Sequence, residues 1–196
     1  MATAAFTGLT AGAIHAVAGP DHVLSLAPVS FGRPRGAWRV GLLWGIGHGI
    51  GTIVAALGLF LFAAALPLSG LEAWAERLAG VALLVMGIVG LRKGAASVAM
   101  GAAQASRSLV VVGCVHGLTG AAALVMLLPA ALSSSPSFRA LYVGGFALGS
   151  TLAMAALTSA LAALCRRGRL QRATGWLTRA ASVGAVLLGS FWLLGA

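Results

Sequence analysis

In the stretch Gly12-Ala13-Ile14-His15-Ala16-Val17-Ala18-Gly19-Pro20-Asp21-His22, two histidines and an aspartate interrupt an apolar run. Proline inside a helix lacks a backbone donor and clashes with the preceding turn, and it pushes the residue before it toward extended geometry. The stretch therefore predicts a helix that is kinked or unwound at Gly19-Pro20. Such a break would bring Asp21 and His22 back toward His15, whereas an unbroken helix would separate the two histidines by about 10 Å along its axis.

The composition places this helix in a membrane protein. Of the 196 residues 60% are hydrophobic and 8% are charged, the mean hydropathy is +1.00, and the only acids are Asp21, Glu72 and Glu76. A soluble domain of this composition would have too little polar surface to cover its core. Ionisable side chains are costly inside a bilayer, so the histidines and Asp21 indicate a functional site.

Several other classes are excluded. The net charge of +10 does not indicate a nucleic-acid partner, because the basic residues stand in short gaps between apolar runs. Cys114 and Cys165 show no CxxC spacing, which argues against a disulfide framework and a structural zinc site. The first apolar run has no basic segment before it, so residues 1–30 are interpreted as a retained span and not as a cleaved signal peptide.

Six apolar runs approach the length of about 20 residues that a helix needs to cross a bilayer. They cover about 4–30, 38–65, 74–91, 108–132, 139–164 and 176–195. The basic residues gather after the first, third and fifth runs, around the predicted loops 31–37, 92–107 and 165–175. The positive-inside rule makes these loops cytoplasmic, so both termini are expected on the non-cytoplasmic side of the cell (inner) membrane.

An internal repeat relates the two halves of the chain. A shift of 101 positions places Gly12 on Gly113, His15 on His116, Gly19 on Gly120, Leu26 on Leu127 and Pro28 on Pro129. Each half, 4–91 and 108–195, has three spans, so the two must enter the membrane in opposite directions. We therefore expect an all-α, polytopic membrane domain over 1–196, built as two inverted three-helix repeats whose first helices are kinked or broken.

His15, His48 and His116 all fall near the membrane midplane when depth is counted along their helices. Imidazole nitrogens with one carboxylate oxygen suit Ni(II), Co(II), Zn(II) or Cu(II). The predicted metal ligands are His15, Asp21, His22, His48 and His116. Two other interpretations stay open: a single intramembrane histidine can be a hydrogen-bonding group between helices, and Asp21 can cap a half-helix that restarts after Pro20.

The elements His15-Ala-Val-Ala-Gly-Pro-Asp21-His22, Trp44-Gly-Ile-Gly-His48 and Val115-His116-Gly resemble the nickel/cobalt transporter superfamily. Within it, the chain is most similar to NicO-type and urease-accessory UreH-like membrane proteins. The resemblance implies a six-span, two-repeat permease for Ni(II) or Co(II), with the same five side chains as its site. The spacing departs from that of the nickel permeases, because five residues and not four separate His15 from Asp21.

Sequence leaves three alternatives open: an exporter of small sulfur-containing anions, a membrane conduit for reducing equivalents, and a scaffold that transports nothing. The second needs paired thiols, yet Ala13 stands where the repeat would match Cys114. We expect a transporter and not an enzyme. Its expected partners are a divalent metal ion and the lipid bilayer, with no prosthetic group and no nucleic acid, and a homo-oligomer is compatible with the sequence.

Overall fold

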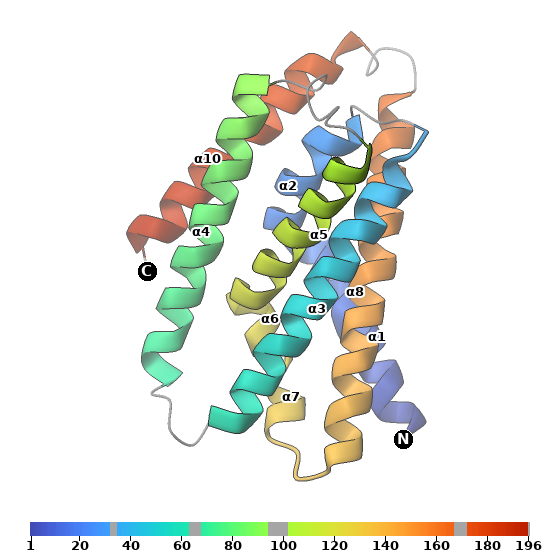
Figure 1. Cartoon of the computed structure of the whole chain (residues 1–196), viewed down its shortest axis with the longest axis vertical. Coiled ribbons are helices and arrows are strands. Elements are labelled where there is room, and N and C mark those ends of the chain that lie inside the picture. The colour runs from blue at the N-terminus through green and yellow to red at the C-terminus, as the bar shows by residue number, and fades with distance from the viewer. Residues whose placement is uncertain (32–34, 63–67, 94–101, 167–171, 196) are drawn as a thin grey trace.

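The computed structural model describes residues 1–31, 35–62, 68–93, 102–166 and 172–195, and the elements in these ranges are helices. In chain order they are α1 (Ala2–Ala18), α2 (Pro20–Phe31), α3 (Ala37–Phe62), α4 (Leu68–Lys93), α5 (Ala102–Thr119), α6 (Ala121–Met126), α7 (Leu128–Ala131), α8 (Pro136–Cys165) and α10 (Thr174–Gly195). They form an elongated bundle (Figure 1). The prediction of an all-α protein is confirmed.

The helices pack in a few dominant pairs. The helix α1 lies mainly against α8, α3 lies against both α5 and α8, and α10 lies against α4 (Figure 1). The short α2 bridges these groups, since it contacts α10 and α8. The helices α1, α2, α3 and α5 thereby meet in the interior of the bundle.

Glycines set the closest of these approaches. A Cβ atom on Gly12 would collide with the backbone carbonyl of Phe146 in α8, and one on Gly117 would collide with that of His48 in α3. Small residues allow helix backbones to come this close. In membranes helix association depends on such close packing, because no hydrophobic driving force acts between the helices. Gly47 and Gly51 of α3 meet the α5 backbone in the same way.

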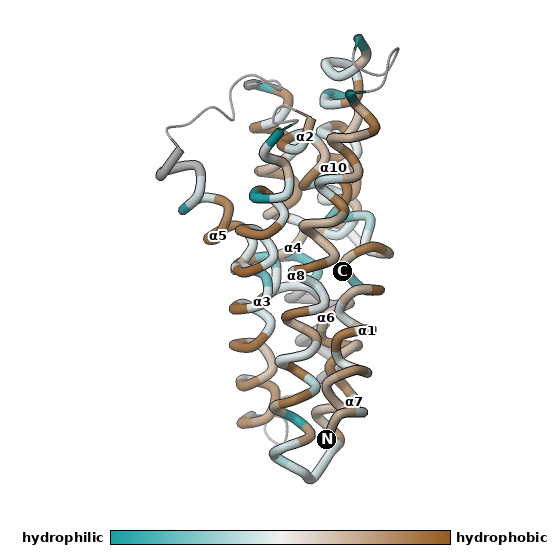
Figure 2. The backbone as a smooth tube through the Cα atoms, turned by 90° about the vertical axis from the view of Figure 1, so that its right-hand side faces the viewer, coloured by the Kyte–Doolittle hydropathy of each residue, from teal (hydrophilic) through white to brown (hydrophobic). Residues whose placement is uncertain are grey.

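Three helices among the described residues are long and apolar enough to cross a membrane: Ala37–Leu61, Pro136–Cys165 and Thr174–Gly195. The apolar helix α1 is shorter. Brown, hydrophobic residues run along most of the bundle in Figure 2, and the apolar side chains of Leu61, Leu187 and Phe191 are exposed. An apolar exterior of this kind suits a lipid environment.

Several helix bounds differ from the predicted spans. The helix α4 begins at Leu68 and not near 74, and α5 begins at Ala102 and not near 108. Charged or polar residues end the apolar runs at these places, but a helix needs only backbone hydrogen bonds and continues through them. Parts of the three predicted basic loops, 32–34, 94–101 and 167–171, lie outside the described residues.

Candidate metal centre

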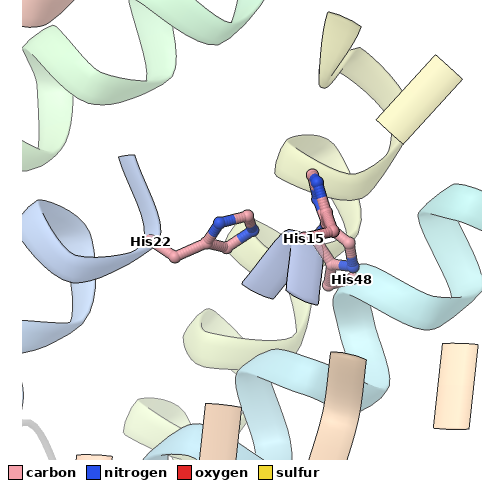
Figure 3. A group of neighbouring side chains, drawn as sticks. All are labelled: His15, His22 and His48. Carbon is pink, nitrogen blue, oxygen red and sulfur yellow. The ribbon is translucent and has the colours of Figure 1, made fainter. Parts of the chain in front are cut away.

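The five predicted ligand residues come together inside the bundle from four helices. His15 lies in the last turn of α1, Asp21 and His22 in the first turn of α2, His48 in α3, and His116 in the last turn of α5. All five are buried, with exposed fractions of 8% or less. Figure 3 shows the His22 ring reaching from its helix toward the rings of His15 and His48.

A break in the backbone brings the predicted ligand residues of α1 and α2 together, as predicted. The helix α1 ends at Ala18, Gly19 is extended with φ −71° and ψ 111°, and α2 starts at Pro20. Proline is well suited to a first helical position, where its missing N–H costs nothing. The ring centroids of His15 and His22 are consequently 4.9 Å apart.

Gly19 also lies too close to the cluster for a larger residue. A Cβ atom there would be 2.6 Å from Oδ1 of Asp21 and would overlap Nδ1 of His22. The same kind of break occurs at Gly120, which has φ −71° and ψ 106° and separates α5 from α6. His15 and His116 each precede a break of this kind by four residues.

Asp21 is the anionic centre of the cluster. Its Oδ2 lies 2.7 Å from Nε2 of His116, a hydrogen-bond distance, and its Oδ1 lies 3.4 Å from Nδ1 of His22. A carboxylate that holds an imidazole in this way fixes the orientation of the ring and raises the basicity of its other nitrogen. Asp21 therefore connects the first half of the chain to the second half.

The other imidazoles pack ring against ring around His22. Its centroid lies 5.2 Å from that of His48 and 5.0 Å from that of His116. Two groups of candidate ligand atoms result, each with all its atoms within 4.8 Å of one another: His15, His22 and His48, and Asp21, His22 and His116. His22 belongs to both groups.

Several nitrogens in the cluster have no hydrogen-bond partner among the described residues. They are Nε2 of His15, Nε2 of His48 and Nε2 of His22, while Nδ1 of His22 has only its 3.4 Å contact with Oδ1 of Asp21. Leaving a buried polar atom without a partner costs on the order of 1–3 kcal/mol. Unpaired buried groups in native proteins call for an explanation, and an ion is one of the few available. The donor set of imidazole nitrogen and carboxylate oxygen fits a divalent transition metal.

Thr52 orients the His48 ring, a role that sequence analysis missed. The Thr52 hydroxyl lies 3.5 Å from the carbonyl oxygen of Gly117 and 3.4 Å from Nδ1 of His48. A hydroxyl that donates its one proton to that carbonyl has its oxygen free to accept from Nδ1–H of His48. In that tautomer the lone pair of His48 lies on Nε2, which has no hydrogen-bond partner among the described residues. The spacing of four residues on one helix was the signal available in the sequence.

A cavity of about 270 Å³ reaches the cluster from one side. His15, Asp21, His48 and His116 line it, together with Glu76 of α4 and Trp192 of α10. Glu76 was not among the predicted site residues. Its span was expected to begin near residue 74, which would put Glu76 at the end of that span and away from the midplane. The five side chains of the cluster are buried, but His15, Asp21, His48 and His116 line this cavity.

The fold and the cluster define a helical protein with membrane-type helices and a buried histidine–aspartate site. The chain is similar to the Chloroplast protein FOR GROWTH AND FERTILITY 2 of Arabidopsis thaliana, with 31% identity over 205 residues, and to FOR GROWTH AND FERTILITY 1 of the same plant, with 28% identity over 211 residues. Each match covers 95% of this chain. No family model and no solved structure matches the chain.

The chain spans 55% and 58% of the length of these two relatives. Their names describe growth and fertility proteins of the chloroplast, and not nickel or cobalt transporters. The resemblance to the nickel/cobalt transporter superfamily and the permease function drawn from it are therefore wrong. The Gly-Pro-Asp-His element misled because it specifies a helix break with two side chains beside it, a geometry that does not fix a biological process.

Proposed function

We propose that this chain is a multi-pass membrane protein that holds a divalent transition-metal ion among His15, Asp21, His22, His48 and His116. The proposal concerns binding, and transport is no part of it. One observation carries it: four buried imidazoles lie clustered with a buried carboxylate, and the Nε2 atoms of His15, His22 and His48 lack hydrogen-bond partners among the described residues. A cluster held together only for stability would pair these atoms, because each unpaired one weakens the fold.

The chemistry of the donor atoms limits which metal ions this site would suit. Neutral imidazoles and a carboxylate suit Zn(II), Ni(II), Co(II) or Cu(II), and no thiolate or thioether is among the five residues. The hydrogen bond from Thr52 to the carbonyl of Gly117 leaves Nε2 of His48 unprotonated and able to ligate. Asp21 would offset part of the charge of the ion while it orients His116.

A titration of the purified full-length chain in detergent tests this proposal. After treatment with a chelator, addition of Zn(II) should give saturable binding by calorimetry and should raise the unfolding temperature. A ligand at 100 times its dissociation constant stabilises the folded state by about 2.7 kcal/mol, so the thermal shift is measurable. Absence of both effects with Zn(II), Ni(II), Co(II) and Cu(II) would contradict the proposal.

We also propose that the bundle consists of two inverted three-helix repeats, with six crossings and both termini on the non-cytoplasmic side. The breaks at Gly19 and Gly120, 101 positions apart, support this arrangement. Paired contacts support it too: Gly12 meets the carbonyl of Phe146, and Gly113 meets that of Trp44. A shift of 101 positions carries Gly12 to Gly113, and one of 102 carries Trp44 to Phe146.

Cysteine labelling tests the topology. Arg35 lies in the turn before α3 and Ser134 in the turn before α8, and both are exposed. In a background without Cys114 and Cys165, Ser134→Cys should react with a membrane-impermeant maleimide added outside intact cells. The matched variant Arg35→Cys should react only after the membrane is opened. Labelling of Arg35→Cys from outside, or of both positions equally, would contradict the proposed orientation.

A further inference from the structure

Glu76 lies on the wall of the same cavity that reaches the histidine cluster. It is half-buried in α4, and the buried Ala79, one turn further on, also lines the cavity. Residues three apart share one face of a helix, so this face of α4 borders the cavity. The sequence holds only three acidic residues, and two of them, Asp21 and Glu76, border this one space.

The charge of the ion explains why a second carboxylate would be placed there. The imidazoles are neutral when they ligate a metal, so Asp21 alone leaves a divalent ion with one uncompensated positive charge. An uncompensated charge away from water is costly. Among the described residues Glu76 is the other acidic residue on the cavity wall, and its charge would make the loaded site electrically neutral.

We propose that Glu76 captures the metal ion in the cavity and supplies the second negative charge that the loaded cluster needs. This inference rests on the proposed metal-binding function. Glu76 acts from the cavity wall and the five clustered side chains hold the ion, so its loss should slow entry and weaken binding without abolishing it. Because Glu76 lies on the wall of this cavity, the ion would enter the cluster from the side of the bundle that carries Glu76.

Zinc binding by purified Glu76→Gln, Glu76→Asp and wild-type chains tests the inference. We expect Glu76→Gln to weaken Zn(II) binding on the order of 10-fold, the lower end of what supporting residues contribute to metal affinity. Its association rate, followed by rapid mixing, should be lower and less sensitive to salt, because a carboxylate no longer attracts the ion. Glu76→Asp should keep most of the wild-type rate.

A surface substitution with the same change in net charge serves as control. Ser134→Lys also adds one positive unit, but in the exposed turn between α7 and α8, and it should bind Zn(II) as the wild type does. Unchanged affinity and unchanged association rate in Glu76→Gln, alongside a wild type that binds Zn(II), would overturn the inference alone. A wild type that binds no Zn(II) would overturn the proposed function and this inference with it.

Discussion

Replacing His22 with leucine is expected to weaken zinc binding by on the order of 100-fold or more while leaving the metal-free protein at least as stable as the wild type. His22 belongs to both groups of candidate ligand atoms, so its loss disrupts each of them. Residues that only support metal ligands contribute about 10- to 100-fold to affinity, so a shared ligand should contribute on the order of 100-fold or more. Calorimetry with Zn(II) measures this effect.

The expected gain in stability has a separate cause. The His22 ring is fully buried, its Nε2 has no hydrogen-bond partner among the described residues, and its Nδ1 has only the 3.4 Å contact with Oδ1 of Asp21. Leucine fills a similar volume without a polar atom, which removes a penalty on the order of 1–3 kcal/mol for each unpaired group. Sites that bind ligands commonly cost stability in this way. Thermal unfolding of chelator-treated protein measures the difference.

Trp44→Phe is the matched control for His22→Leu. Trp44 is buried next to His116, and its indole nitrogen also lacks a partner among the described residues, but it is not one of the five proposed ligands. The phenylalanine variant should therefore retain zinc binding. If His22→Leu bound Zn(II) normally, His22 would not be a ligand, and if the metal-free variant unfolded far below the wild type, the histidine would be a structural residue.

Asp21→Asn is expected to weaken zinc binding by about 10- to 100-fold, the range measured for residues that orient metal ligands. Asparagine can still accept a hydrogen bond from Nε2 of His116, so the variant mainly removes the negative charge. It also caps helix N-termini as well as aspartate does. The variant thus separates the charge of Asp21 from the capping role that the sequence left open. Zn(II) calorimetry provides the measurement.

A double-mutant cycle with His116→Ala shows whether Asp21 acts through its hydrogen-bonded partner. The effects of substitutions at residues in one network do not add. The double variant should therefore bind Zn(II) only slightly less tightly than the single variant with the lower affinity. Full additivity would contradict the coupling between Asp21 and His116. Wild-type affinity in Asp21→Asn would contradict any role for the carboxylate in binding the ion.

Sequence alone predicted the convergence of the five residues because each step depended on a local rule. Gly19-Pro20 specifies a helix break whatever surrounds it. Ionisable groups are costly in lipid, which predicts that His15, His48 and His116 lie close together inside the bundle. Glu76 and Thr52 were not predicted. Their roles depend on which helices pack together, and a run of apolar residues carries little information about its neighbours.

The packing pattern determines when, during synthesis of the chain, the cluster can form. The chief partner of α1 is α8, α3 packs on α5 and α8, and α4 packs on α10, so helices of the first half depend mainly on helices of the second. A nascent chain that ends at Lys93 lacks these partners and also lacks His116. His15, Asp21, His22 and His48 lack these partners at that stage, so the cluster can assemble only once the ribosome has produced α5 and α8.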